Sequence, residues 1–135
     1  MTPRQRVLKA VNHQVPDRVP IDLGGCKASG IAATAYDKLK RALGIPGCTK
    51  ISDPRFMIAV VEEEVLQRLH VDVIPLDLSI LLSLVRDDRD WVPRRLFDGT
   101  EVLFPPDTRL AEDPDGSWVL LQTDGSLSTF RMPKG

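Results

Sequence analysis

Residues suited to substrate binding gather just after a short apolar run near the N-terminus. The run covers residues 19–23 and is stopped by Gly24-Gly25. Its end and the residues that follow read Asp22-Leu23-Gly24-Gly25-Cys26-Lys27. Two adjacent glycines let a ligand approach the backbone closely, and they equally suit a tight turn between a strand and a helix. Asp22 and Lys27 add one charge of each sign, which suits the positioning of a polar substrate. Asp22, Gly24, Gly25 and Lys27 are therefore the candidate substrate-binding residues.

Asp77 is the candidate catalytic residue. It stands in Leu76-Asp77-Leu78-Ser79, directly after a second apolar run at residues 71–76. An aspartate at the carboxyl end of a strand is either a functional carboxylate or the cap of the next segment. The sequence leaves both interpretations open.

The histidines and cysteines form no recognisable metal or nucleophile motif. Cys26 and Cys48 show no CxxC or other ligand spacing, so we expect two reduced thiols. We expect His13 to hydrogen-bond in its loop and His70 to interact with the C-terminal dipole of a helix. No P-loop, dinucleotide fingerprint, nucleophile elbow or HExxH sequence is present. No metal ligand is assigned.

The first element expected to position these residues is a helix with a clear start signal. Thr2 caps it, Pro3 suits its first position, and Gln5 completes a capping box. Its apolar stripe at helical spacing is formed by Val7, Leu8 and Val11. Residues 19–23 then indicate a strand that Gly24-Gly25 stops.

Further helices and strands alternate as far as residue 76. A second helix is predicted from Ser29, with Gly44 as its C-terminal cap, followed by a short strand at residues 49–52. Its apolar face consists of Ile31, Ala35, Leu39 and Leu43. Asp53 is expected to cap a third helix with the stripe Met57, Val61, Val65 and Leu69. Residues 71–76 then indicate a buried strand, so the order predicts right-handed parallel βα units.

The last part of the chain has a different character. Three Asp-Gly pairs, at residues 98–99, 115–116 and 124–125, separate apolar or alternating runs. The runs cover residues 101–104, 117–122 and 127–132. We expect a first unit at residues 1–90 and an antiparallel β-meander, inserted into the parallel core, at residues 91–135.

Composition excludes several classes of partner. The formal net charge of the 135 residues is -1, so a nucleic acid is not expected as a partner, because binding its phosphates needs a basic surplus. The apolar, uncharged run at residues 78–85 is far shorter than the roughly 20 residues of a membrane span. The basic N-terminus leads into a polar helix and not into an apolar signal core. A cytoplasmic protein is the expectation.

The opening of the chain resembles that of the uroporphyrinogen-decarboxylase superfamily, which includes corrinoid-dependent methyltransferases. The similar stretch reads Arg4-x-Arg6-Val7-Leu8-x-Ala10-Val11-Asn12-His13-Gln14-x-Pro16-Asp17-Arg18-Val19-Pro20. Similarity continues through residues 21–25, Ser29-Gly30-Ile31 and Ala35-Tyr36-x-x-Leu39. It includes Val71-Asp72-Val73, Asp98-Gly99-Thr100, Pro105-Pro106-Asp107 and residues 115–120.

The resemblance implies a (β/α)₈ barrel with its active site at the carboxyl ends of the strands. Since a complete barrel needs about 250 residues, these 135 are expected to form an incomplete N-terminal portion. Open sheet edges and apolar faces need covering, so we expect self-association or a complementing chain.

The resemblance also suggests two reactions. Decarboxylases of the superfamily bind polyanionic tetrapyrroles through an Arg-Gln-Ala-Gly-Arg segment, whereas this chain has residues 22–27 there, with no arginine. Their catalytic aspartate lies in Phe-Ser-Asp-Ile, and the spacing of Asp77 from Asp72 departs from that pattern. Methyl transfer with a corrinoid protein, aided by zinc that forms a thiolate, is the preferred interpretation for the intact enzyme.

In the methyltransferases that the chain resembles, the zinc ligands are a His-x-Cys pair and a distant cysteine. Neither His13 nor His70 is followed by a cysteine at that spacing. The zinc and the corrinoid protein are thus expected to engage residues outside this chain. Three alternatives remain open: a tetrapyrrole decarboxylase, a non-catalytic or split subunit, and a small binding module built on the meander.

Overall fold

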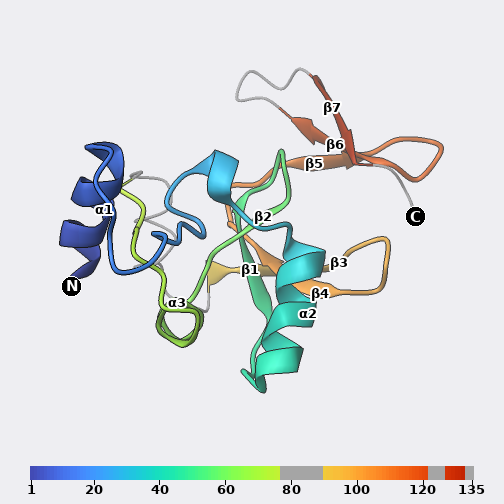
Figure 1. Cartoon of the computed structure of the whole chain (residues 1–135). Coiled ribbons are helices and arrows are strands. Elements are labelled where there is room, and N and C mark those ends of the chain that lie inside the picture. The colour runs from blue at the N-terminus through green and yellow to red at the C-terminus, as the bar shows by residue number, and fades with distance from the viewer. Residues whose placement is uncertain (77–89, 122–126, 133–135) are drawn as a thin grey trace.

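The computed structural model describes residues 1–76, 90–121 and 127–132, and it shows a mixed α/β fold (Figure 1). The helices are α1 (Pro3–Val11), α2 (Ala33–Leu43) and α3 (Glu63–Arg68), with a 3₁₀ turn, η1, at Lys27–Ser29. The strands are β1 (Thr49–Asp53), β2 (Ile58–Ala59), β3 (Val92–Arg95), β4 (Glu101–Phe104), β5 (Leu110–Glu112), β6 (Trp118–Leu121) and β7 (Leu127–Met132).

Two sheets organise these strands. One has the order β2-β1-β4-β3 and the other the order β5-β6-β7. β1 and β4 run parallel, and the other pairs are antiparallel. No (β/α)₈ barrel is evident within the described ranges.

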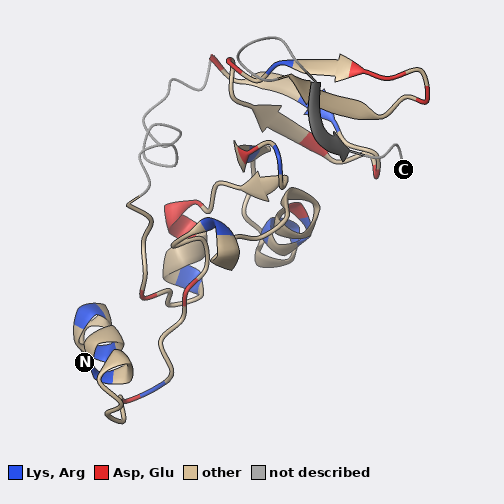
Figure 2. Cartoon of the chain, turned by 90° about the horizontal axis from the view of Figure 1, so that it is seen from above, with Lys and Arg blue, Asp and Glu red and all other residues tan. Residues whose placement is uncertain are grey.

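Helix α1 begins as its capping signals predict. The Thr2 hydroxyl accepts a hydrogen bond from the Gln5 N–H at 3.3 Å, and the Gln5 side chain accepts one from the Thr2 N–H at 3.0 Å. The apolar stripe, however, does not face a core, since Leu8 and Val11 are exposed. The buried residue of α1 is Arg6, and the helix lies well apart from both sheets (Figure 2).

Helix α2 ends where predicted and begins later. Gly44 takes up the left-handed conformation, with φ of 70°, that terminates a helix. The expected start at Ser29 is wrong, because residues 27–29 form the separate turn η1 and α2 starts at Ala33. Ala35 of the predicted apolar face is exposed, whereas Tyr36 and Lys40 are buried.

The third helix was predicted over too long a range. Asp53 ends β1, and its carboxylate accepts a hydrogen bond from the Arg55 N–H at 2.8 Å, which forms a turn instead of a helix cap. Residues 58–59 then pair with β1, and α3 begins at Glu63. The pairing of residues 58–59 with β1 outweighs the helical spacing of the apolar residues. That spacing is a local property and gives no information about a strand partner elsewhere in the chain.

The predicted strands at residues 19–23 and 71–76 are not formed as strands. Both are irregular, and Val19, Ile74 and Leu76 are exposed. They meet at one point, where the Asp72 N–H donates to the Ile21 carbonyl at 2.8 Å and the Ile21 N–H donates to the Asp72 carboxylate at 3.0 Å. A side-chain acceptor thus replaces one bond of a strand ladder, and Pro20 has no N–H to extend the ladder.

The antiparallel strands of the last part follow their turn signals. Gly99 and Gly116 have positive φ values of 84° and 81° in the β3–β4 and β5–β6 turns. The predicted strand at residues 101–104 matches β4, and those at 117–122 and 127–132 correspond to β6 and β7. Asp124-Gly125 lies outside the described residues. Since β4 pairs with β1, strands from both sides of the expected boundary at residue 90 share one sheet.

Two apolar clusters stabilise this arrangement. Ile51, Val102 and Phe104 centre one cluster, to which Trp118 of the second sheet adds an edge-on ring contact with Phe104 at 6.2 Å. Tyr36 and Val65 centre the other, which joins α2 to α3. The second cluster holds α3 beside the loop that carries the candidate binding residues.

Candidate functional site

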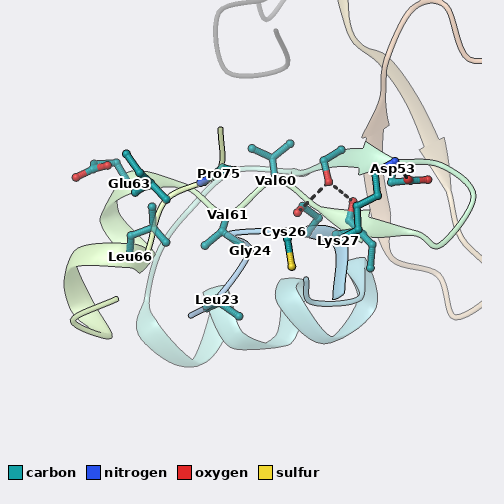
Figure 3. Close-up of a pocket in the computed structure, with 14 residues that line it drawn as sticks. Leu23, Gly24, Cys26, Lys27, Asp53, Val60, Val61, Glu63, Leu66 and Pro75 are labelled. Carbon is teal, nitrogen blue, oxygen red and sulfur yellow. Dashed lines mark hydrogen bonds and ion pairs between the residues drawn. The ribbon is translucent and has the colours of Figure 1, made fainter. Parts of the chain in front are cut away.

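A cavity of about 280 Å³ lies beside the loop that contains Gly24 and Lys27 (Figure 3). It is bounded by that loop, by the ends of β1 and β2, by the start of α3 and by residues 74–75. Its apolar lining is formed by Leu23, Ile58, Ala59, Val60, Val61, Leu66, Ile74 and Pro75. Such concave, mainly apolar surfaces with a few polar groups are typical of small-molecule sites.

The principal charges at the cavity neutralise each other. The Lys27 ammonium lies 2.7 Å from the Asp53 carboxylate, with side-chain exposures of 52% and 8%. Burial raises the pKa of Asp53, but the hydrogen bonds from Lys27 and Arg55 outweigh burial and hold the pKa below its ordinary value. The Asp53 carboxylate is therefore ionised at neutral pH.

Two of the four predicted binding residues line the cavity and two do not. Gly24 and Lys27 are lining residues, and Gly24 has a positive φ of 84°. The Asp22 carboxylate instead accepts a hydrogen bond from the Gly25 N–H at 2.8 Å. A Cβ atom at Gly25 would approach this carboxylate to 2.5 Å and Val73 to 2.6 Å, so glycine is needed for close packing. Asp22 and Gly25 thus shape the loop. Asp77 lies outside the described residues.

Sequence reasoning missed Cys26, whose thiol also lines the cavity. Its Sγ atom lies 3.5 Å from the Ser29 hydroxyl. Hydrogen bonds from the Ser29 side chain, and then from the Ser29 and Ala28 N–H groups, lower the pKa of Cys26 below its ordinary value. The Cys26-x-x-Ser29 spacing, which resembles a capping box, was the available signal. Asp53, Val60 and Val61 were missed because the sequence placed them in one long helix.

A second group of charged side chains connects α1 to residues 17–18 and to residue 72. Arg6 forms ion pairs with Asp72 and with Asp17, and the latter measures 2.7 Å. Arg18 lies 2.7 Å from Asp72. The hydrogen bond from Arg6 is the main cause that lowers the pKa of Asp17 well below its usual range, although burial opposes it. These charges hold α1 to the body of the protein and leave no cation directed at a ligand.

Neither a metal-binding group nor a membrane-spanning helix is found in the described part of the chain. Among residues 1–76, 90–121 and 127–132, no three His, Cys, Asp or Glu side chains come together as a metal site. None of the helices in this part of the chain has the length and apolar character needed to cross a bilayer.

We expect Lys27→Met to lower the free energy of unfolding by about 1 kcal/mol at pH 6, because Asp53 loses its half-exposed partner. A carboxylate with a depressed folded pKa stabilises above its unfolded pKa, and this contribution disappears as pH falls through the folded value. The difference between Lys27→Met and the unchanged chain should therefore shrink below about pH 4. Urea unfolding at several pH values measures it.

Lys9→Met removes an exposed lysine of α1 and is the matched control. Its effect should stay within about 0.5 kcal/mol at every pH. A Lys27→Met effect that is independent of pH would contradict the ionised pair.

Comparison of the chain with protein-family models, curated proteins and solved structures found no match.

Proposed function

We propose that the chain forms the substrate-binding end of an enzyme of the uroporphyrinogen-decarboxylase superfamily, and that the intact enzyme carries out corrinoid-dependent methyl transfer. The observation that supports this most directly is the position of the cavity. Leu23 ends the segment at residues 19–23, and Gly24 and Lys27 follow it, while Ile74 and Pro75 lie near the end of the segment at 71–76. The cavity thus lies at the carboxyl ends of both segments, which is where barrel enzymes bind their substrates.

The contact between the two segments also supports a barrel. Consecutive strands of a (β/α)₈ barrel are parallel neighbours. Here Ile21 and Asp72 exchange two hydrogen bonds, at 2.8 and 3.0 Å, between two of the segments that are predicted to be strands. In the completed barrel, this contact would be extended into a strand ladder.

Exposed apolar side chains on these segments give such a completion an energetic reason. Val19, Ile74 and Leu76 are all largely exposed, and strands of a parallel barrel are normally buried on both faces. Further barrel strands, from additional chain or from a partner, would cover them. A split subunit that needs a complementing chain is the second candidate function, and the same exposed residues favour it.

The charges at the cavity favour methyl transfer over tetrapyrrole decarboxylation. A tetrapyrrole with several carboxylates needs unpaired cations, and arginine forks serve best. Lys27, the lysine that lines the cavity, is already paired with Asp53 at 2.7 Å. A polyanion would have to break this pair before it gained any attraction.

The chain's own contribution to the reaction would be to bind and to exclude water. Gly24 forms part of the wall, where a Cβ atom would come within 3.0 Å of a Val61 methyl group, and the apolar wall that includes Val60 and Val61 keeps water from the bound molecule. Zinc would activate a thiol acceptor, but the described residues do not fit a zinc site, so no step is assigned to zinc in this chain.

The test is a methyl-transfer assay. It uses the protein encoded by the natural reading frame that contains these residues, expressed alone and together with the product of any adjacent reading frame. Methylcobalamin, zinc and 2-mercaptoethanol are supplied, and demethylation is followed by the visible spectrum of the corrinoid. We expect transfer that falls at least tenfold in Val61→Phe, which fills the cavity, and is unchanged in Val11→Phe, which alters an exposed valine of α1.

Conversion of uroporphyrinogen without methyl transfer would replace the proposal by the decarboxylase alternative. Activity that appears only with the adjacent product would favour the split subunit. Absence of both reactions in every form would overturn the enzymatic assignment.

A further inference from the structure

We infer that the cavity takes a small, uncharged and mainly apolar molecule, about as large as one substituted aromatic ring, and that it rejects anions. This inference names the ligand class of the cavity and so rests on the proposed function's placing of the substrate there. It follows from the size of the cavity, from its charge balance and from the satisfied state of its polar groups.

The size of the cavity limits the ligand. Its volume of about 280 Å³ is roughly twice the ~150 Å³ of an apolar protein cavity that holds benzene. One ring with a few substituents fits, whereas a tetrapyrrole or a nucleotide does not. The apolar lining supplies binding through burial of the ring, because transfer of apolar surface from water is favourable.

The charge balance disfavours an ionic ligand. Lys27 and Asp53 form a 2.7 Å pair at one end of the cavity. Glu63, at the other end, turns its carboxylate away from the cavity in Figure 3, and it accepts a hydrogen bond from Gln67 at 2.9 Å. No unpaired side-chain charge among the described lining residues is therefore directed at the ligand.

The remaining polar groups are already satisfied by the protein. The Ser52 hydroxyl lies 3.1 Å from the Ile58 carbonyl and 3.3 Å from the Ala59 carbonyl. The Cys26 thiol interacts with Ser29. An ion that enters such a site loses its water and gains no new partner, which is costly, whereas an uncharged ring loses little.

The experiment compares three probes of similar shape, toluene, benzoate and benzylamine, by isothermal titration calorimetry on the full chain. We expect toluene to bind at least tenfold more tightly than benzoate or benzylamine. Benzoate binding as tight as that of toluene would overturn the inference, and so would the absence of toluene binding at its solubility limit.

Two charge variants make the prediction sharper. Lys27→Met leaves Asp53 as the unpaired charge, so the preference of benzylamine over benzoate should rise at least tenfold. Asp53→Asn leaves Lys27 unpaired and retains an oxygen for the Arg55 N–H, so the preference should reverse in favour of benzoate. Unchanged preferences in both variants would show that the probes bind elsewhere, and would overturn the inference.

The location is tested by Val61→Phe, which fills the cavity, against Val11→Phe on the exposed face of α1. Val61→Phe should abolish toluene binding and Val11→Phe should leave it unchanged. If Val61→Phe fails to fold, Cys26→Phe adds the same ring from an exposed lining residue. Toluene binding that survives a folded cavity-filling variant would contradict the site.

The two proposals fail separately. Toluene binding at the cavity without methyl transfer would leave the ligand class in place and overturn the proposed reaction. Methyl transfer by a chain that prefers benzoate to toluene would overturn the ligand class alone.

Discussion

Asp72→Ala is expected to lower the free energy of unfolding by about 3–5 kcal/mol, which is the usual cost of removing one partner from a buried ion pair. The Asp72 side chain is fully buried, and it pairs with Arg6 and Arg18. Its carboxylate also accepts the Ile21 N–H at 3.0 Å. The substitution leaves the nearly buried Arg6 guanidinium with Asp17 as its one charged partner, beside the Met1 carbonyl, and it frees the segment at residues 19–23.

Urea unfolding followed by circular dichroism measures this effect. Asp72→Asn keeps the shape of the side chain and loses the charge, so we expect a smaller loss of about 2–3 kcal/mol. Glu64→Ala removes an exposed carboxylate of α3 and should change the free energy by no more than about 0.5 kcal/mol. A loss below about 1 kcal/mol for Asp72→Ala would contradict the anchoring role.

The contribution of Asp72 to the free energy of unfolding also depends on pH. Burial raises the pKa of Asp72, but hydrogen bonds from the Ile21 N–H, Arg6 and Arg18 outweigh burial and lower it. Its contribution is therefore complete above the unfolded pKa near 4 and is lost as pH falls through the folded pKa. The gap between the unchanged chain and Asp72→Asn should close in acid.

The second large effect is expected at Lys40, whose ammonium is buried between α2 and the start of α3. Lys40 lies 2.7 Å from the Glu62 carboxylate, with side-chain exposures of 2% and 34%. The Tyr36 hydroxyl accepts the Glu62 N–H at 2.9 Å, and the Lys40 ammonium lies 5.9 Å from the centre of the Tyr36 ring. Burial is the main cause that raises the pKa of Tyr36 far above its usual value, so its hydroxyl stays protonated.

Glu62→Gln should therefore lower the free energy of unfolding by about 3 kcal/mol, the low end of the range for a broken buried pair, because Glu62 is partly exposed. Lys40→Met removes the buried charge itself and should cost no more than about 1 kcal/mol. Adding Glu62→Gln to Lys40→Met should cost no more than about 1 kcal/mol further, so the coupling energy in the double-mutant cycle is at least about 2 kcal/mol.

The chain contains a matched exposed pair for comparison. Arg95 and Glu101 lie 2.9 Å apart on β3 and β4, with side-chain exposures of 71% and 66%. Glu101→Gln should change the free energy of unfolding by no more than about 0.5 kcal/mol. Equal effects of Glu62→Gln and Glu101→Gln would contradict the dependence on burial that the cycle assumes.

The candidate site was accessible to sequence reasoning only in part. The loop at residues 22–27 was found, because glycines next to charged residues after an apolar run are a local signal. The far wall of the cavity was not found, since Val60 and Val61 reach it after β2 pairs with β1. Neither the sequence of β1 nor that of β2 shows by itself that the two strands pair.

What the sequence by itself determined are features that a few neighbouring residues control. Thr2 with Gln5 starts α1, Gly44 ends α2, and Gly99 and Gly116 form the turns before β4 and β6. In each case the backbone geometry or the capping bond strongly favours these residue types, whatever the rest of the chain does.

The tertiary structure alone decided which charges are buried and which apolar residues are not. Lys40, Arg6 and Asp72 are buried, while Val11, Val19 and Leu76 are exposed, against the polarity of each side chain. A buried charge is tolerated when an opposite charge from a distant segment meets it, as Glu62 meets Lys40. Because the partner is far away in the sequence, its effect arises only when the chain has folded.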